Sequence, residues 1–228
     1  MEVLRLHRWD VTYREALEIQ EDLKGRLVEQ GPPGPPRTVA GADVSTARGD
    51  DTVFAAVVLF TFPDLELKEV SRAVGRASFP YIPGLLSFRE GPVLLSAFLG
   101  LQDRPDCVIF DGQGIAHPRG IGLASHMGLL LDLPTVGCAK RRLVGTHDPV
   151  GEKAGDRAPL YHEGREVGVV LRTKDRTRPL FVSPGHRMDI EGAVGIVMAC
   201  RRGYRLPEPV RQAHLEVNRM RLRVDASS

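Results

Sequence analysis

Residues 105–139 read PDCVIFDGQGIAHPRGIGLASHMGLLLDLPTVGCA, and this stretch decides the fold of the chain. Residues 105–110 predict a strand, because Cys107-Val108-Ile109-Phe110 is a continuous apolar run. Residues 121–131 have the apolar pattern of a helix, and residues 135–139 predict a second strand. Strand, helix and strand in this order are typical of a βαβ unit with parallel strands. Because both strands are apolar along their whole length, we expect them in the buried middle of a sheet.

The pattern upstream of this unit is that of an antiparallel meander. Residues 38–45, 53–60 and 65–70 are short runs rich in β-branched and aromatic residues, and turn residues separate them. A helix is expected between the meander and the first apolar strand, because apolar residues recur from Phe88 to Leu99. This order predicts an α/β fold with a ribonuclease H-like mixed five-stranded sheet flanked by helices, in which the first meander strand is central.

Segments outside this core predict further helices, extra loops and a small β extension. Residues 12–29 have apolar residues at helical spacing and begin with the capping-box pattern Thr12-x-x-Glu15. Two short strands and two closing helices are expected towards the carboxyl end, at residues 168–171, 180–182, 192–200 and 209–221. Residues 146–159 show no pattern that we assign. There is no internal repeat, and we expect one domain over residues 1–228.

The composition is that of a globular protein. Of the 228 residues, 42% are hydrophobic and 26% are charged, which excludes a disordered or fibrous chain, and the apolar runs are strand-sized rather than membrane-sized. The N-terminus lacks the pattern of a signal peptide. Cys107, Cys138 and Cys200 each lie in an apolar run without CxxC spacing. We therefore expect buried reduced thiols, no membrane span and a cytoplasmic location.

Charge is distributed unevenly along the chain. Residues 1–139 carry 13 Lys and Arg against 18 Asp and Glu, whereas residues 140–228 carry 18 against 11. A basic carboxyl-terminal part hints at a polyanionic partner, because Lys and Arg near phosphates release condensed counterions. Charge taken alone is better explained by a solvated basic face.

Three carboxylates stand where a structural role is hard to assign. Asp43 interrupts the strand of residues 38–45, Glu90 lies at the head of the helix after Phe88, and Asp111 ends the first apolar strand. Any one of them alone is better explained as a turn or cap residue. If the first strand is central, however, the two aspartates converge at the sheet edge and Glu90 reaches across to them. Clustered carboxylates need a divalent cation, and oxygen ligands favour Mg²⁺ or Mn²⁺, which indicates metal-assisted phosphodiester hydrolysis.

Two histidines and a lysine are candidates to act beside the carboxylates. His117 lies in the Gly-rich loop after the first apolar strand, which matches neither GxGxxG nor the P-loop. Lys140 follows the second apolar strand, where a cation could meet a scissile phosphate, although an ordinary surface lysine would look the same. His214 shares a helix face with Val210 and Val217 and is expected to point inward. A core histidine is the default interpretation of such a residue, and only the carboxylates favour a catalytic one.

The segment Phe79-Pro80-Tyr81-Ile82-Pro83-Gly84 holds an aromatic and a branched aliphatic side chain between two prolines. The prolines fix the backbone, so both side chains are presented on a rigid loop. A hydrophobic plug over the core would look the same. Apolar wedges that part stacked bases are also built in this way.

Taken together, these residues resemble the endonuclease V family, the deoxyinosine 3′ endonucleases, nearly end to end. Several long motifs occur in the family's order, which makes the match specific. The matching segments are residues 6–10 (LHRWD), 39–45 (VAGADVS), 79–84 (FPYIPG), 88–92 (FREGP), 111–117 (DGQGIAH), 125–128 (SHMG), 137–140 (GCAK) and 181–186 (FVSPGH).

The resemblance implies a site as well as a fold. The fold would be ribonuclease H-like, and the acidic metal site would consist of Asp43, Glu90 and Asp111. His117, Lys140 and His214 match catalytic positions near the scissile phosphate. Further residues match the family's strand-separating wedge, Pro80, Tyr81, Ile82 and Pro83, and its main-chain pocket for a flipped hypoxanthine, Gly84, Leu85, Gly112 and Gly122.

The resemblance further implies a Mg²⁺-dependent enzyme of DNA repair, in which Mn²⁺ can substitute. It would cut the second phosphodiester on the 3′ side of deoxyinosine in double- or single-stranded DNA, leaving 3′-hydroxyl and 5′-phosphate ends, and we expect it to act as a monomer. An endonuclease for inosine in RNA is the nearest alternative, because only the 2′-hydroxyl distinguishes the substrates. A non-catalytic module that binds damaged nucleic acid is disfavoured by the retained carboxylates, and a glycosidase by the low aromatic content of 6%.

Overall fold

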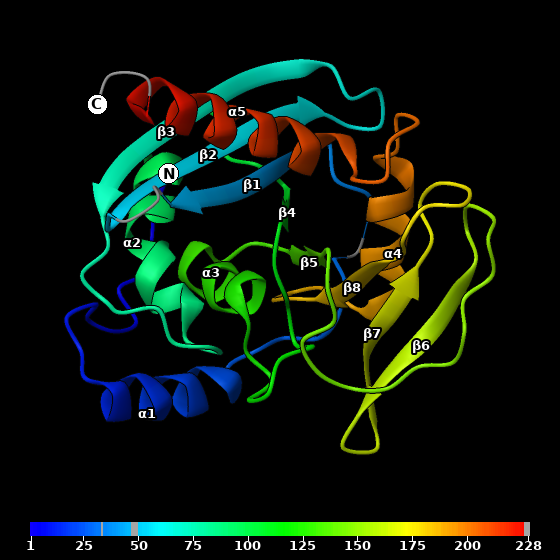
Figure 1. Cartoon of the computed structure of the whole chain (residues 1–228), viewed down its shortest axis with the longest axis horizontal. Coiled ribbons are helices and arrows are strands. Elements are labelled where there is room, and N and C mark those ends of the chain that lie inside the picture. Colours follow the sequence, from blue (N-terminus) through cyan, green and yellow to red (C-terminus); the bar gives the residue numbers. More distant parts are fainter. Residues whose placement is uncertain (33, 47–49, 226–228) are drawn as a thin grey trace.

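The computed structural model describes residues 1–32, 34–46 and 50–225, without the side chains of residues 224 and 225. In this part of the chain the strands form one eight-stranded mixed sheet with the order β3-β2-β1-β4-β5-β8-β7-β6 (Figure 1). The strands are β1 (Thr38–Thr46), β2 (Thr52–Thr61), β3 (Leu67–Arg76), β4 (Cys107–Phe110), β5 (Thr135–Ala139), β6 (Arg157–His162), β7 (Arg165–Leu171) and β8 (Leu180–Pro184). The helices are α1 (Tyr13–Lys24), α2 (Leu86–Leu99), α3 (Leu123–Leu131), α4 (Ile190–Ala199) and α5 (Glu208–Asp225).

Strand β1 lies between β2 and β4, as the sequence predicts for the first meander strand. β1, β2 and β3 pair in antiparallel fashion, whereas β4 pairs in parallel with β1, and β5 with β4. Helix α2 connects β3 to β4, and α3 connects β4 to β5. The predicted mixed α/β sheet flanked by helices is confirmed.

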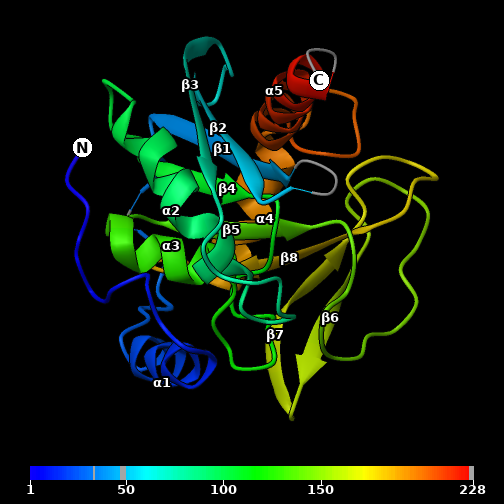
Figure 2. The same ribbon diagram turned by 60° about the vertical axis from the view of Figure 1, so that its left-hand side comes forward.

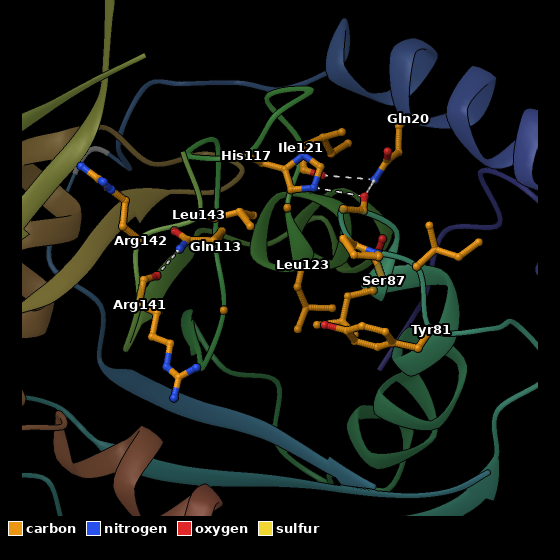
Figure 3. A pocket seen from close by; sticks show the side chains of 16 residues that line it. Gln20, Tyr81, Ser87, Gln113, His117, Ile121, Leu123, Arg141, Arg142 and Leu143 are labelled. Atoms are coloured by element: carbon orange, nitrogen blue, oxygen red, sulfur yellow. Dashed lines mark hydrogen bonds between the residues drawn. The ribbon is translucent and has the colours of Figure 1, made fainter. Parts of the chain in front are cut away.

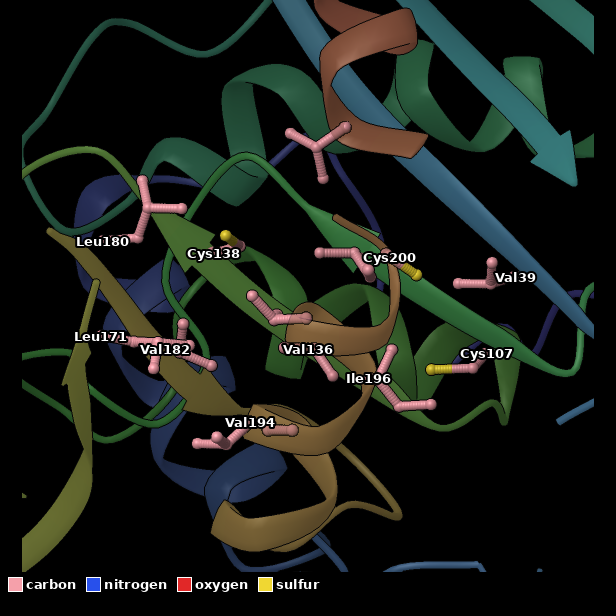
Figure 4. Packing of buried hydrophobic residues seen from close by; sticks show 14 of the residues in the cluster. Val39, Cys107, Val136, Cys138, Leu171, Leu180, Val182, Val194, Ile196 and Cys200 are labelled. Carbon is pink, nitrogen blue, oxygen red and sulfur yellow. The ribbon is translucent and has the colours of Figure 1, made fainter. Parts of the chain in front are cut away.

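The two largest hydrophobic clusters of the described residues lie on opposite faces of this sheet. Side chains alternate along β1, so Val39 belongs to the core that α4 and α5 cover, and Ala40 belongs to the core that α2 and α3 cover. The α4 and α5 core also contains Cys107, Cys138 and Cys200, which are free and buried (Figure 4). The thiols are therefore core residues, as predicted.

The approach of α5 to β1 depends on Gly41. A Cβ atom at this position would lie 2.0 Å from the carbonyl carbon of Pro209, which no real side chain tolerates. Any larger residue would push α5 away from the sheet. Because side chains alternate along a strand, Asp43 projects from the same face as Gly41. The close packing of α5 on β1 thus brings His214 to Asp43.

The β extension is larger than predicted and continuous with the central sheet. β8 pairs antiparallel with β5, and β7 and β6 follow, so three strands extend the predicted five (Figure 2). β6 begins within residues 146–159, to which the sequence pattern assigns nothing. Only Ala158 and Leu160 of this edge strand are buried, and two apolar positions give a weak signal.

The first helix is shorter than predicted but begins as expected. The Thr12 hydroxyl accepts from the amide of Glu15 over 3.3 Å, and the Glu15 carboxylate accepts from the amide of Thr12 over 2.8 Å, which completes the capping box. The helix ends at Lys24, with Gly25 as its cap. Among the described residues, no helix combines the length and apolar character that crossing a bilayer requires.

Candidate active site

Asp43 and Asp111 lie side by side on the two central parallel strands. In the strand register Ala42 pairs with Phe110, and the amide of Asp111 donates to the carbonyl of Ala42 over 3.0 Å. The two aspartates follow these residues directly, so their side chains project from the same face of the sheet. Asp43 is only 7% exposed, and Asp111 is partly buried. The fold therefore brings together two carboxylates that are far apart in sequence.

Two basic side chains contact this pair. Nδ1 of His214, from α5, donates to Oδ2 of Asp43 over 2.7 Å, because a carboxylate can only accept. Lys140, which directly follows β5, forms an ion pair with Asp111, and its Nζ lies 3.4 Å from Nδ1 of His214. One side-chain ligand atom from each of Asp43, Asp111 and His214 lies within 4.8 Å of the others. Two carboxylates, a histidine and a lysine thus converge on one spot.

Glu90 lies on α2, which covers the other face of the sheet, near enough for the charges of Asp43 and Asp111 to act on it. The pKa of Glu90 is raised from 4.5 to about 8, mainly because burial penalises its charge and further because Asp43 and Asp111 repel it. The neighbouring Arg89 offsets only part of this effect, since its guanidinium is bound to the Phe79 carbonyl and to Asp51. Within the described residues, no hydrogen bond satisfies the Glu90 carboxylate.

These carboxylates fit a hard divalent cation. Burial and the charge of Asp43 raise the pKa of Asp111, and Lys140 and His214 oppose this shift only partly. A bound cation would replace the repulsion among the three carboxylates by attraction, and oxygen ligands are those that Mg²⁺ and Mn²⁺ prefer. The Glu90 carboxylate, which the two aspartates repel and Arg89 only partly compensates, favours such a site over a purely structural network of ion pairs. Asp43 and Asp111, together with His214, therefore form a possible acidic metal-binding group.

A pocket of about 330 Å³ adjoins the carboxylates (Figure 3). Gly112, which follows Asp111, lies in its wall, and so does Ser87, one helical turn before Glu90. The walls come from α1, the segment from Tyr81 into α2, the Gly-rich loop after β4 and the segment after β5. The residues that line the pocket include Gln20, Tyr81, Ile82, Pro83, Gly84, Ser87, Gly112, Gln113, His117, Gly122 and Arg141.

The predicted wedge lies at this pocket. Tyr81 is 70% exposed and lines the pocket together with Ile82 and Pro83. The amide of Leu85 donates to the carbonyl of Ile82 over 3.0 Å, and Gly84 has φ of 80°. Proline followed by glycine at positive φ is the signature of a type II turn. The backbone beside Tyr81 is therefore rigid.

The predicted base-pocket residues divide into two groups. Gly84, Gly112 and Gly122 line the pocket, whereas the side chain of Leu85 is buried behind it. Pro80, from the predicted wedge, is exposed and lies outside the pocket lining.

His117 lies in the pocket wall rather than among the carboxylates. Its Nδ1 accepts from the amide of Arg119 over 3.2 Å, so its Nε2 carries the proton and donates to the carbonyl of Gly84 over 3.1 Å. Burial, together with the charge of Arg119, lowers the pKa of His117 to about 4. At neutral pH this ring is uncharged, and both of its nitrogens are occupied.

Sequence reasoning assigned no role to several pocket residues. Gln20 lies on the buried face of α1 with Ala16 and Leu23, and a polar side chain among apolar ones is the signal that could have singled it out. Ser87 and Gln113 have no such pattern around them. Arg141, which directly follows Lys140 in the sequence, also lines the pocket, and its carbonyl accepts from Nε2 of Gln113.

A mixed sheet with acidic side chains on its central strands, beside a pocket of about 330 Å³, fits the class of nucleases, the hydrolases of phosphodiester bonds. The chain matches the family model of Endonuclease V over residues 21–215. It is 50% identical over 215 residues to the Endonuclease V of Dehalococcoides mccartyi (strain BAV1), a match that covers 94% of this chain and 96% of that protein.

Solved structures agree with this match. The structure of the Endonuclease V from Streptomyces avermitilis superposes with a TM-score of 0.89 at 40% identity, over 96% of each chain. The Endonuclease V of Ciona intestinalis, in complex with a 24mer DNA containing an inosine followed by a ribo-adenosine, shares the fold with a TM-score of 0.83 at 23% identity, over 92% of this chain and 98% of that one. The chain belongs to the endonuclease V family, and the family expected from the sequence is confirmed.

Proposed function

We propose that this nuclease is a Mg²⁺-dependent enzyme of DNA repair that recognises deoxyinosine, the product of adenine deamination. It hydrolyses the second phosphodiester bond on the 3′ side of the lesion, and Mn²⁺ can substitute for Mg²⁺. Water adds to the phosphorus and the 3′ oxygen leaves, so the products carry 3′-hydroxyl and 5′-phosphate ends. The observation that carries the proposal is the convergence of Asp43, Glu90 and Asp111 beside a pocket rimmed by Tyr81.

Asp43, Glu90 and Asp111 would hold the ion in this proposal. A bound Mg²⁺ would supply the Lewis acid that generates the attacking hydroxide and stabilises the departing oxygen. His214 orients Asp43 through its 2.7 Å hydrogen bond, and Lys140 presents a cation where the scissile phosphate would add negative charge. His117 is also a functional residue in this proposal. Its hydrogen bond to the Gly84 carbonyl supports a part in shaping the pocket.

The pocket and the wedge supply recognition in this proposal. Tyr81, with Pro80, Ile82 and Pro83, would part the strands, and the main chain around Gly84, Leu85, Gly112 and Gly122 would surround the flipped hypoxanthine. An inosine pair costs less to open than a normal pair, which favours the lesion. The inosine in the DNA bound by the Ciona intestinalis Endonuclease V supports this substrate class. We propose that both double- and single-stranded DNA are accepted.

Cleavage of inosine-containing RNA is the second candidate. The DNA bound by the Ciona intestinalis protein carries a ribo-adenosine directly after the inosine, and this observation favours a 2′-hydroxyl near the cleavage position.

We also propose that the protein acts as a monomer and that residues 1–228 form one domain, which the continuous sheet supports. A cytoplasmic location is proposed on the three free, buried thiols, which suit a reducing compartment.

Replacement of the aspartates tests the proposal. Asp43→Ala and Asp111→Ala should each abolish cleavage of a duplex with one deoxyinosine in Mg²⁺, while circular dichroism shows an unchanged fold. Asp148→Ala, which removes an exposed carboxylate outside both the pocket lining and the metal-binding group, is the matched control and should keep full activity. Full activity of both site variants would overturn the proposed mechanism.

A further inference from the structure

The carbonyl oxygen of Gly84 accepts hydrogen bonds from three side chains that are far apart in sequence. Nε2 of Gln20 donates over 3.0 Å and Nε2 of His117 over 3.1 Å (Figure 3). Nη2 of Arg119 donates over 2.6 Å. A carbonyl oxygen has two lone pairs, so three donors more than saturate it. We call Gln20, His117 and Arg119 the Gly84 clamp.

The members of the clamp also fix one another. Nε of Arg119 donates to Oε1 of Gln20 over 2.5 Å, and the amide of Arg119 donates to Nδ1 of His117. Gln20 is 1% exposed, and its Nε2 also reaches the carbonyl of Ile121 over 3.4 Å. The clamp therefore joins α1 to the Gly-rich loop in one partly buried network, and every side-chain polar atom of Gln20 takes part.

The oxygen that the clamp holds belongs to the turn behind Tyr81. The peptide between Gly84 and Leu85 carries this oxygen at one end, and its N–H closes the type II turn on the carbonyl of Ile82. Donors on a peptide oxygen polarise the peptide and strengthen the hydrogen bond that its N–H donates. The guanidinium of Arg119 adds charge to this effect. The clamp thus reinforces the turn at the point where its backbone needs positive φ.

We propose that Gln20 and Arg119 are positioning residues for lesion recognition: with His117 they lock the turn of residues 82–85, so that Tyr81 is presented in one preformed arrangement. This inference rests on the proposed function. A preformed loop loses less conformational freedom when it meets the duplex, and this raises affinity without a new contact. Neither residue needs to touch the nucleic acid for this effect.

Four variants separate the clamp from general stability. Gln20→Met removes the donor to Gly84 while filling nearly the same volume, and Arg119→Met removes the guanidinium. Arg119→Lys keeps the charge without the fork and should show an intermediate effect. Leu23→Met is the matched control, because Leu23 is fully buried one turn further along α1 and takes no part in the clamp.

The first measurement needs no substrate. Hydrogen exchange of the Leu85 amide, followed by NMR, should become about tenfold faster in Gln20→Met than in the wild type, because the bond to Ile82 loses its support. Leu23→Met should leave this rate unchanged. Equal exchange rates in Gln20→Met and the wild type would show that the clamp does not hold the turn, and would overturn the inference.

The second measurement is a double-mutant cycle on binding. Fluorescence anisotropy in EDTA gives the preference for a deoxyinosine duplex over the unmodified duplex. If the clamp acts through Tyr81, Tyr81→Ala should reduce this preference at least about fivefold in the wild type and less than about twofold in Gln20→Met. Fully additive effects would overturn the inference.

The two measurements also distinguish failure of the clamp from failure of the proposed function. A wild type that binds both duplexes equally would contradict the proposed deoxyinosine recognition, and the positioning role in recognition would fall with it. The exchange rate of Leu85 would then still decide whether the clamp holds the turn. A wild type that prefers the lesion, with additive variants, would overturn the clamp alone.

Discussion

Nδ1 of His214 lies 2.7 Å from Oδ2 of Asp43, although 171 residues separate them in sequence. Gly41 makes this contact possible, because only a residue without a side chain lets α5 pack so closely on β1. The final helix thus supports a carboxylate of the central strand. We infer that His214 acts mainly by orienting Asp43 through its Nδ1.

This role predicts an order among His214 variants. Asparagine places an N–H close to the position of Nδ1, whereas glutamine mimics Nε2 and alanine removes the donor. We expect His214→Ala and His214→Gln to lower kcat on the order of 10²-fold, because a carboxylate displaced by about 1 Å costs that much. His214→Asn should retain the most activity. Equal losses in the Asn and Ala variants would contradict the orienting role.

Glu90→Gln should abolish cleavage and, at alkaline pH without metal, make the protein more stable. The raised pKa of Glu90, about 8, means that the folded protein keeps a proton that the unfolded chain releases above pH 4.5. The free energy of unfolding therefore falls as pH rises from about 4.5 to about 8 in the absence of metal. In EDTA at pH 8.5, Glu90→Gln should unfold at least about 3 °C above the wild type.

The same variant should lose cleavage and the thermal stabilisation that Mg²⁺ gives the wild type. Differential scanning fluorimetry at pH 4.5 and 8.5 is the measurement, and the difference between the proteins should vanish at the lower pH. A Glu90→Gln variant less stable than the wild type at pH 8.5 would contradict the repulsion among the carboxylates.

Tyr81→Ala should weaken binding without weakening the fold. Because the side chain is 70% exposed, its removal should change the free energy of unfolding by less than about 0.5 kcal/mol. Affinity for a deoxyinosine duplex should fall clearly more than affinity for the unmodified duplex. Urea unfolding and fluorescence anisotropy measure the two effects. An unchanged ratio of the affinities for the deoxyinosine and the unmodified duplex would contradict the wedge role.

Stability should also depend on the buried His126, which pairs with His7. Nε2 of His126 lies 2.6 Å from Nε2 of His7, and its ring stacks on Trp9. Burial, and then the charge of His7, lower the pKa of His126 from 6.5 to about 3. The unfolded chain therefore binds a proton that the folded protein does not. The stabilisation is complete above about pH 6.5 and is lost progressively as pH falls towards 3.

Urea unfolding between pH 7.5 and 5 measures this effect. The difference in free energy of unfolding between the wild type and His126→Gln should shrink by about 1.4 kcal/mol for each pH unit below 6.5. Taking the difference cancels the opposite contribution of Glu90. A constant difference across this range would show that His126 titrates normally in the folded protein.

Continuous apolar patterns made the central sheet predictable. β4 and β5 are buried along their whole length, so residues 105–110 and 135–139 could be assigned as strands from the short apolar runs within them. The neighbouring positions of Asp43 and Asp111 then followed from strand order. β6 could not be found in this way. It is an edge strand with alternating exposure, and only two of its residues, Ala158 and Leu160, are buried, which is too few for an apolar pattern.

The clamp and the pairing of His214 with Asp43 depend on side-chain directions that no pattern in one sequence reveals. His117 is an example: its loop indicated a site, but only the structure shows that both ring nitrogens are occupied, by Arg119 and Gly84. The role of Gln20 depends on one carbonyl oxygen that lies 64 residues away in sequence. Such contacts follow from the packing of α1 against the loops, which periodicity does not encode.

Mapping the cleavage products tests the central claim most directly. A labelled duplex with one deoxyinosine and a matched RNA with one inosine are incubated with the enzyme in Mg²⁺ or EDTA, and the nick is mapped at nucleotide resolution. We expect a Mg²⁺-dependent nick at the second phosphodiester 3′ to the inosine in the DNA, with 3′-hydroxyl and 5′-phosphate ends. Cleavage in EDTA, cleavage of the unmodified duplex at the same rate, or cleavage of RNA alone would contradict it.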